Sequence, residues 1–166
     1  MVNAPINTPD ILPSLLGLAN INIPKTIEGE DLSALIKSPN ANIDRTVLVM
    51  NVCPFATEYE NKEYRGIRTN QYTYVSTPDG ASMMFDNLKD PYQMDNLIDK
   101  SEYAALQKKL DKKLGKALKE IGDEDFRARD YYLEKWNLTI NNKKTNAVDY
   151  HKFLENEGEM QMPKVD

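Results

Sequence analysis

The strongest constraint on the fold is a change of hydrophobic period in the second half of the chain. Before it, three short segments rich in β-branched and aromatic residues lie at residues 63–69, 72–76 and 81–87, separated by the turn signals Asn-Gln and Thr-Pro-Asp-Gly. After it, apolar residues recur every three or four positions from Tyr103 to Ile121. Alternation predicts strands and the longer spacing predicts a helix. Together they predict an antiparallel meander followed by a helix, which is an α+β fold.

A fourth strand is predicted upstream, because the run RTVLVMNV at residues 45–52 is continuous in β-branched and aliphatic side chains. The helix covers about residues 101–121, which corresponds to roughly 30 Å. Gly122 follows as a natural C-terminal cap. We therefore expect a four-stranded antiparallel sheet with one long helix packed on one face. The acidic stretch Asp-Glu-Asp-Phe then predicts a second helix that carries Phe126, Leu133 and Trp136.

An apolar helix is predicted near the N-terminus, over about residues 8–20. Thr8 is the expected N-cap, Pro9 fits the first helical position, and Asp10 favours the positive end of the helix dipole. Leaving five of its large apolar side chains in water would forfeit roughly 7–15 kcal/mol, which is comparable to the stability of a whole domain. We therefore expect residues 8–20 to fold back on the sheet or to mediate self-association.

Composition is that of an ordinary globular chain of 166 residues, with 40% hydrophobic and 28% charged residues and a formal net charge of -5. The negative charge argues against a protein that coats nucleic acid, and no stretch approaches the roughly 18–20 apolar residues of a membrane span. The lone cysteine, Cys53, excludes an internal disulfide, and His151 is the only histidine. Residues 139–166 are polar and are expected to form a tail.

The stretch YRGIRTNQYTYV at residues 64–75 concentrates the candidate binding residues. If its central Asn-Gln forms the turn, Arg68 pairs with Thr73 and Ile67 pairs with Tyr74. Side chains alternate along a strand, so Ile67 and Tyr74 face the long helix and Arg68 faces the other way.

Arginine suits recognition of an oxyanion, because its planar guanidinium donates in a fork. Arg68, together with Arg65 and Tyr64 of the same stretch, is a candidate substrate-binding residue. The alternative interpretation of Arg68 is a surface arginine paired with a nearby acid.

A second cationic feature is the run KKLDKKLGKALK, which places six lysines on the long helix. A solvated outer face accounts for this run, because the lysines fall between the apolar positions. Nucleic-acid binding would require arginine or aromatic residues on the same face, and the lysine side has neither. A small interaction module that binds a protein or a nucleic acid through this helix or the apolar N-terminal helix remains the alternative function.

Three motifs in succession resemble the C-terminal end of formylglycine-dependent sulfatases, members of the alkaline-phosphatase-like superfamily. Residues 7–36 resemble the family's leucine-rich helix and proline-bearing linker, and residues 64–75 are similar to its hairpin vRt-x-x-yKYi. Residues 83–97, MMFDNLKDPYQMDNL, are similar to eLYDL-x-x-DP-x-E-x-x-NL. The sequence departs from this pattern at Thr73, where lysine is common, and at Gln93, where glutamate is usual. The resemblance extends from about Val2 to Trp136.

The resemblance implies a parent protein that hydrolyses sulfate esters with a calcium ion and a formylglycine, both held by a large N-terminal α/β domain. Here Cys53 is followed by Pro-Phe-Ala-Thr, so the Cys-x-Pro-Ser-Arg motif is absent and neither cofactor is expected in this chain. The implied organisation is a terminal helix and linker of that catalytic domain at residues 1–40, the C-terminal subdomain at 41–138, and a tail of unknown role at 139–166. The chain alone is expected to be inactive.

The partners implied by the resemblance are the N-terminal sulfatase domain and a sulfated substrate, expected to be a carbohydrate. The open face of the sheet would abut that domain, with Arg68 and the loop from Pro54 to Lys62 at the rim of the substrate pocket. A periplasmic or secreted parent fits the resemblance, and no nucleic acid or membrane is expected as a partner. A related phosphohydrolase or phosphotransferase of the same superfamily is a further alternative.

Overall fold

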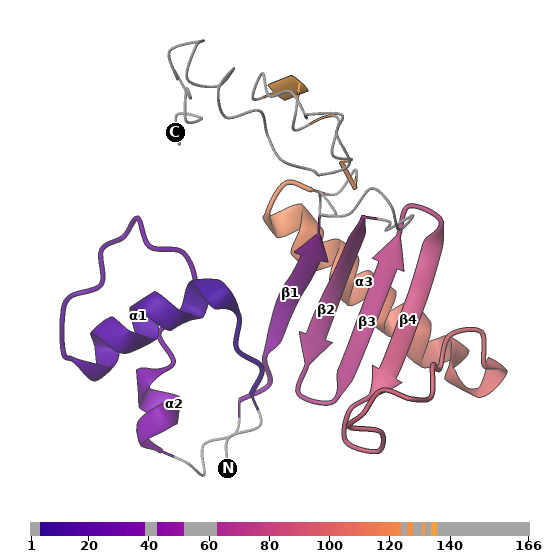
Figure 1. Ribbon diagram of the computed structural model, residues 1–166, viewed down its shortest axis with the longest axis horizontal. Helices are drawn as coiled ribbons and strands as arrows, with labels where there is room; N and C mark the ends of the chain where they lie inside the picture. The colour runs from indigo at the N-terminus through magenta and orange to yellow at the C-terminus, as the bar shows by residue number, and fades with distance from the viewer. Residues whose placement is uncertain are drawn as a thin grey trace, which may run out of the picture.

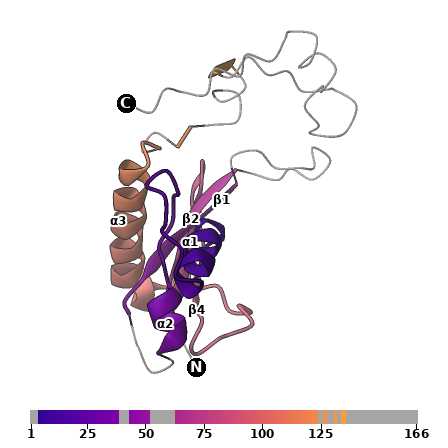
Figure 2. The same cartoon turned by 90° about the vertical axis from the view of Figure 1, so that its left-hand side faces the viewer.

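The computed structural model of the chain describes residues 4–38, 43–51, 63–123, 126–127, 131 and 134–135. Its elements, in order, are α1 (Thr8–Leu18), α2 (Ser33–Lys37), β1 (Thr46–Asn51), β2 (Tyr64–Thr69), β3 (Tyr72–Thr77), β4 (Gly80–Asp86), the 3₁₀ turn η1 (Ser101–Tyr103) and α3 (Ala104–Glu120). Figure 1 shows α1 and α2 beside the sheet, and Figure 2 shows α3 against one face of it. We refer to α1, α2 and the linker between them as the N-terminal arm.

The four strands form one antiparallel sheet in the order β1-β2-β3-β4. Each strand pairs with the next one along the chain, so the sheet is a meander. The predicted four-stranded sheet with a long helix on one face is thereby confirmed. Strand boundaries lie within two residues of those expected, because the turn residues that end each strand are local signals.

The core lies between the sheet and α3. Its buried members are Ile67, Tyr74, Met84, Leu97, Leu110, Leu114 and Leu118. The Tyr74 hydroxyl donates to Asp111 Oδ1 at 3.0 Å, which satisfies a polar group at the edge of this core. Burial first, and then the neighbouring Asp111 carboxylate, raise the pKa of Tyr74 above its ordinary value. Tyr74 therefore remains a neutral donor at physiological pH.

Helix α3 ends where the sequence predicts. Gly122 follows with φ +70°, a conformation that glycine adopts without a Cβ penalty, and the N–H of Asp123 donates to the Leu118 carbonyl at 2.9 Å. At its other end, η1 supplies one tighter turn before the first α-helical residue.

The start of α1 differs from the prediction by one residue. Asn7, and not Thr8, is the N-cap, and its side chain accepts a hydrogen bond from the Thr8 N–H at 2.8 Å. Asp10 completes a reciprocal capping box by accepting from the Asn7 N–H at 2.7 Å. Asparagine caps at least as well as threonine, so the earlier residue starts the helix.

Asp10 is also the centre of a buried ionic cluster that no local sequence pattern predicts. Arg45, just before β1, donates from Nη2 to Asp10 Oδ1 at 2.7 Å and from Nε to Glu30 Oε2 at 3.1 Å. Its Nη1 donates to the Pro5 carbonyl at 2.6 Å. Because Asp10 and Arg45 are only 2% and 7% exposed, this cluster fixes the N-terminal arm to the start of the sheet.

Hydrogen bonds and charge pairing within the cluster keep the Asp10 carboxylate and the Arg45 guanidinium charged. Burial by itself opposes charge on Asp10, but the hydrogen bonds from Arg45 and from the N–H groups of Glu30 and Asn7 outweigh it and lower its pKa. Burial likewise works against charge on Arg45, and its bonds to Asp10 and Glu30 outweigh that effect and raise its pKa. Gly29 allows the close approach, since it has φ +90° and a Cβ there would lie 2.4 Å from the Pro9 carbonyl oxygen.

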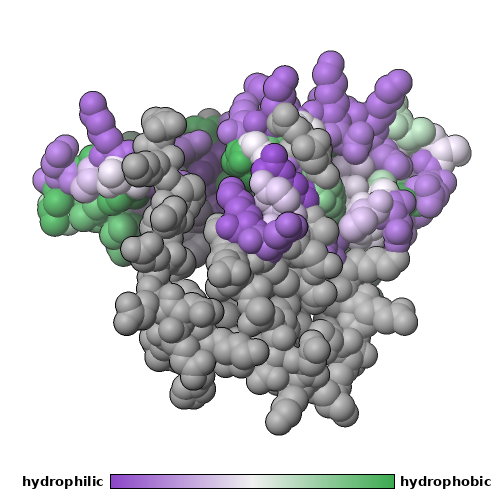
Figure 3. All heavy atoms as spheres, turned by 90° about the horizontal axis from the view of Figure 1, so that it is seen from above, coloured by the Kyte–Doolittle hydropathy of each residue, from purple (hydrophilic) through white to green (hydrophobic). Residues whose placement is uncertain are grey.

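The outer face of α1 carries apolar side chains that remain exposed. Ile11, Leu12 and Leu15 are 50%, 53% and 57% exposed, and Leu18 is 37% exposed. Figure 3 shows hydrophobic surface (green) on the N-terminal arm, at the left. Helix α1 packs on α2 rather than across a face of the sheet, so the expected return of residues 8–20 to the sheet is not observed. None of the helices in the described ranges is long and apolar enough to cross a membrane.

Candidate functional site

The candidate site lies on the sheet face opposite α3, near the turn between β2 and β3. Arg68 pairs with Thr73 across the two strands, and Ile67 pairs with Tyr74. Ile67 and Tyr74 are fully buried in the α3 core, whereas Arg68 is exposed. Because successive side chains point to opposite faces, this register directs Arg68 away from α3. The predicted hairpin register is therefore confirmed.

Arg68 has a neutral partner. Its Nη1 donates to Thr73 Oγ1 at 3.1 Å, and no carboxylate among the described residues forms an ion pair with it. The alternative of a surface arginine paired with an acid is thus not seen in this part of the chain. A guanidinium has five N–H donors in a planar fork, so donors remain available for an external anion.

Neutral side chains hold Thr73 in place. Gln93 Nε2 donates to Thr73 Oγ1 at 3.1 Å and to Asn87 Oδ1 at 2.7 Å, and Thr73 Oγ1 lies 3.2 Å from Asn87 Oδ1. Thr73 and Gln93 are the two positions that depart from the sulfatase pattern, and they contact each other. A neutral hydrogen bond between Gln93 and Thr73 therefore replaces the lysine and glutamate that the sulfatase pattern has at these positions. Among Arg68, Thr73, Asn87 and Gln93, only Arg68 is charged.

A hollow of about 280 Å³ adjoins Arg68. It is lined by Ala4, Pro5, Arg68, Thr69, Asn70, Asn87 and Leu88. Asn87 was not predicted as a site residue, although it directly follows β4, and polar side chains at strand ends gather near turns. The hollow combines one cation, two side-chain amides and three apolar residues, a mixture that suits a polar ligand bearing an anionic group.

Tyr64 lies on the same face of β2 as Arg68, four residues away, and is half-buried opposite Asn51 of β1. Strand geometry separates the two positions by roughly 13 Å. They are therefore at opposite ends of one strand face. The segment 52–62 lies outside the described residues; it includes Cys53 and the predicted rim loop from Pro54 to Lys62.

Arg65 points to the other face and is fully buried. Its Nε donates to the Asp123 carboxylate, its Nη2 donates to the Arg127 carbonyl at 2.8 Å, and its guanidinium lies 4.6 Å from the centre of the Phe126 ring. The expectation that Arg65 binds substrate is not supported by this burial. Arg65 instead joins β2 to the chain that follows α3, through a partner 58 residues away.

The described residues include no group of three or more His, Cys, Asp or Glu side chains placed to hold a metal ion. Several sequence features lie outside the described part of the chain: Cys53, His151, the Leu133 and Trp136 of the predicted second helix, and residues 139–166. The described residues therefore do not form the acidic cluster that a calcium site requires.

The known proteins that this chain resembles are sulfatases. Residues 2–120 match the family described as N-sulphoglucosamine sulphohydrolase, C-terminal. The chain is 59% identical over 162 residues to an ulvan-active sulfatase of Formosa agariphila, covering 98% of this chain and 31% of that protein. It is 30% identical over 135 residues to an endo-4-O-sulfatase of Bacteroides thetaiotaomicron, covering 71% of this chain and 26% of the relative.

A solved structure shares the fold. It holds a protein in complex with its substrate D-glucosamine-2-N,6-O-disulfate, with a TM-score of 0.58 and 26% identity over 70% of this chain and 24% of that one. The chain spans between a quarter and a third of the length of the curated relatives described above. With a family match over most of its length and a sheet and helix like those of a sulfatase, the chain belongs to the family of sulfatase C-terminal domains.

Proposed function

We propose that this chain acts as the C-terminal subdomain of a sulfuric ester hydrolase and that Arg68 binds an anionic group of a sulfated carbohydrate. The observation that carries the proposal is the position of Arg68, a cation with no acidic partner among the described residues, beside a hollow of about 280 Å³. A hydrogen bond from a guanidinium to a sulfate oxygen is charge-assisted and roughly twice as strong as a neutral one. Tyr64 and the loop from Pro54 to Lys62 would extend the rim at the other end of β2.

In this proposal the chemistry belongs to a catalytic portion that this chain does not contain. Formylglycine and calcium, which the resemblance implies, would be held there, and the present chain would shape the pocket and be inactive alone. The relatives support this division, because the chain matches less than a third of their length.

The exposed face of α1 would pack against that catalytic portion. Four side chains that are each between one third and three fifths exposed would gain about 1 kcal/mol apiece on burial. The Arg45 cluster holds α1 to the start of the sheet, so residues 1–40 would present this apolar face in a fixed orientation relative to residues 41–138. In the isolated chain the same face would mediate self-association.

A chimeric enzyme tests the role of Arg68. This chain would replace the C-terminal third of the Formosa agariphila sulfatase, to which it is 59% identical, and sulfate release from ulvan would be measured. The chimera should be active. Arg68→Ala should then lower kcat/KM about tenfold to a hundredfold, because the loss of one hydrogen bond from a charged donor corresponds to about 1.5–3 kcal/mol.

Two further variants test whether the loss is specific to the guanidinium of Arg68. Arg68→Lys keeps the charge but not the fork, and should recover only part of the loss. Lys89→Ala, an exposed cation in the loop after β4, serves as the control and should leave kcat/KM unchanged. If Arg68→Ala left kcat/KM unchanged, the proposed role of Arg68 in substrate binding would be wrong. If the chimera folded but released no sulfate, the proposed function itself would be contradicted.

Self-association of the isolated chain is a separate prediction. Sedimentation velocity should show a concentration-dependent dimer, and the double variant Leu12→Gln/Leu15→Gln should be monomeric because it removes the centre of the apolar face. A matched variant, Met94→Gln/Ile121→Gln, changes two exposed apolar residues elsewhere and should still dimerise. A monomeric wild-type chain, or equal dimerisation of the two variants, would exclude α1 as the interface.

A further inference from the structure

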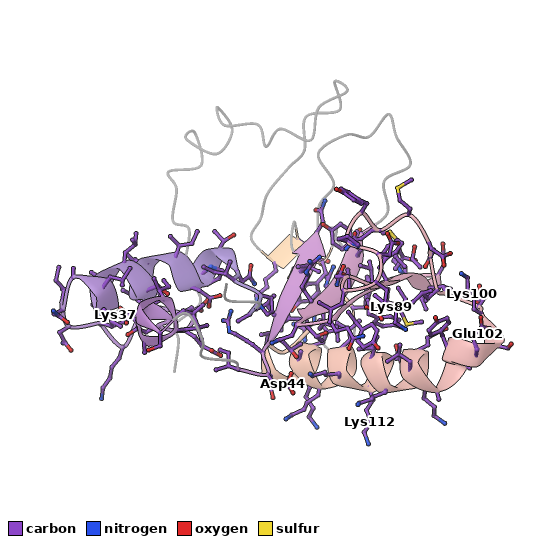
Figure 4. All side chains as sticks on the ribbon, turned by 90° about the horizontal axis from the view of Figure 1, so that it is seen from below. Lys37, Asp44, Lys89, Lys100, Glu102 and Lys112 are labelled. Carbon is purple, nitrogen blue, oxygen red and sulfur yellow. The ribbon has the colours of Figure 1, made fainter. Side chains whose placement is uncertain are left out.

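The outer face of α3 carries the most concentrated positive charge of the described chain. Helix α3 contains six lysines and two carboxylates, an excess of four positive charges in a chain with a formal net charge of -5. The lysines are Lys108, Lys109, Lys112, Lys113, Lys116 and Lys119. At 3.6 residues per turn they fall within an arc of about 140°, opposite the buried leucines. Figure 4 shows the side chains on this edge of α3, including Lys112, pointing away from the sheet.

Few of these charges are neutralised locally. Within the described residues, Lys116 Nζ forms an ion pair with Glu120 Oε1 on this face at 3.8 Å, and both side chains are highly exposed. Asp111, the second carboxylate of the helix, lies nearer the leucine side and accepts a hydrogen bond from Tyr74. The lysine face therefore keeps most of its positive potential.

One side of this face borders a second hollow, of about 260 Å³, between α3 and the turn that joins β2 to β3. Lys109 and Lys113 line it from the helix, and Gln71 and Tyr72 line it from the hairpin. Ammonium groups, a side-chain amide and an aromatic ring are the groups that recognise a sugar ring carrying an acidic substituent. This hollow lies at the helix-covered side of the hairpin, whereas Arg68 points to the opposite face.

We propose that the lysine face of α3 and this adjoining hollow form a second binding surface, for a chain of sulfated polysaccharide. The choice of a sulfated ligand rests on the proposed function. The location of the surface is inferred from the lysine positions and from the adjoining hollow. Its role would be to hold a polymeric substrate on the protein away from the site of hydrolysis, and thereby raise the local concentration of sulfate esters.

The spacing of the lysines suits an extended polyanion. Neighbouring cations four residues apart lie about 6 Å apart along the axis, and Lys108 and Lys119 span about 16 Å. Flexible ammonium groups at such intervals match sulfates distributed along a polymer, each as a point charge. The face has no arginine and no aromatic side chain on the helix itself for stacking bases, which favours a polysaccharide over a single-stranded nucleic acid.

Asp44, an acidic residue that lines the second hollow, allows a test of whether the ligand occupies this hollow. Its carboxylate would repel a sulfate group there. A sulfated unit in the hollow must therefore lie toward Lys109 and Lys113. Removal of this one negative charge by Asp44→Asn should strengthen binding about twofold to threefold if the hollow is occupied.

The experiment measures binding of fluorescein-labelled dextran sulfate to the full 166-residue chain by anisotropy, at several salt concentrations. The variant Lys109→Gln/Lys112→Gln/Lys113→Gln should bind at least tenfold more weakly at low salt, and the slope of log affinity against log salt should fall by about 2. Glutamine is a good helix former, so circular dichroism should report unchanged helix content. Uncharged dextran should not bind.

The matched control is Lys25→Gln/Lys37→Gln/Lys89→Gln, which removes the same net charge from lysines outside α3 and should change affinity by less than about threefold. Equal losses in the two triple variants would overturn the assignment to α3. Weaker or unchanged binding in Asp44→Asn would overturn the role of the hollow. Tighter binding of double-stranded DNA than of dextran sulfate would overturn the ligand class.

This test is independent of the proposed catalytic partner. Binding is measured on the chain alone, so loss of binding in the α3 variant says nothing about Arg68. Conversely, an inactive chimera with intact dextran sulfate binding would contradict the proposed function and leave this surface in place.

Discussion

Replacement of Asp123 by asparagine is expected to lower the free energy of unfolding by about 3–5 kcal/mol. Asp123 holds the guanidinium of Arg65, which is fully buried, and Asp123 is itself only 3% exposed. The neutral amide would leave a buried cation without its counter-charge, and the energy of desolvating that cation would no longer be offset. The Arg127 carbonyl and the Phe126 ring would still contact Arg65, but neither carries a negative charge.

Urea unfolding followed by far-ultraviolet circular dichroism measures this effect. Glu120→Gln is the matched control, because it removes a carboxylate three residues earlier whose side chain is 65% exposed and whose partner Lys116 is 81% exposed. Exposed ion pairs contribute little, so the control should change the free energy of unfolding by no more than about 0.5 kcal/mol. If both variants lost the same small amount, the buried pair would not be a major source of stability.

Replacement of Asp10 by asparagine is expected to cost about 3 kcal/mol at neutral pH. Asp10 Oδ1 accepts from Arg45 Nη2 and from the Glu30 N–H, and Asp10 Oδ2 accepts from the Asn7 N–H. An amide has one oxygen, so its NH₂ group would face a donor on one side or the other. The variant loses the charge, and its NH₂ group replaces the acceptor either of Arg45 and the Glu30 N–H or of the reciprocal cap of α1.

The same residue predicts a pH dependence. The pKa of Asp10 is lowered in the folded chain from its ordinary value of 3.8. A carboxyl with a depressed folded pKa contributes its stability in full above the unfolded value, and that contribution is lost as pH falls from about 3.8 toward the folded pKa. Wild-type and Asp10→Asn chains should therefore differ most above pH 4 and converge in stronger acid.

Thermal unfolding of both chains between pH 2 and about 7 tests the convergence. Glu30→Gln is the control within the same cluster, because Glu30 also pairs with Arg45 but is 68% exposed. It should produce only a small change in stability. A constant difference between wild-type and Asp10→Asn chains down to pH 2 would refute the assigned role of the Asp10 charge.

The two buried ion pairs have a common structural consequence. Arg45 precedes β1 and binds the N-terminal arm, whereas Arg65 of β2 binds the chain that follows α3. Each joins a segment outside the sheet to the sheet itself. The sheet thereby fixes the orientation of the exposed α1 face relative to Arg68, which the proposed docking to a catalytic portion requires.

Local sequence patterns determined the elements of this fold. Alternating apolar residues, the Asn-Gln turn and the spacing of leucines after Tyr103 predict the strands and α3 correctly. They also predict that Arg68 pairs with Thr73 and faces away from the helix. These features depend on interactions between residues close together in the chain, and strand alternation or helix period carries such information directly.

Tertiary structure alone decided the roles of the charged residues. Strand alternation places Arg65 and Arg68 on opposite faces, but it does not show that Arg65 is buried against a carboxylate 58 residues away or that Arg68 is exposed with a neutral partner. Asp10 looked like a helix-dipole residue and proved to bind Arg45, 35 residues further on. Whether a charged side chain is buried and paired depends on residues far away in the sequence, and local residue spacing does not reveal which residues these are.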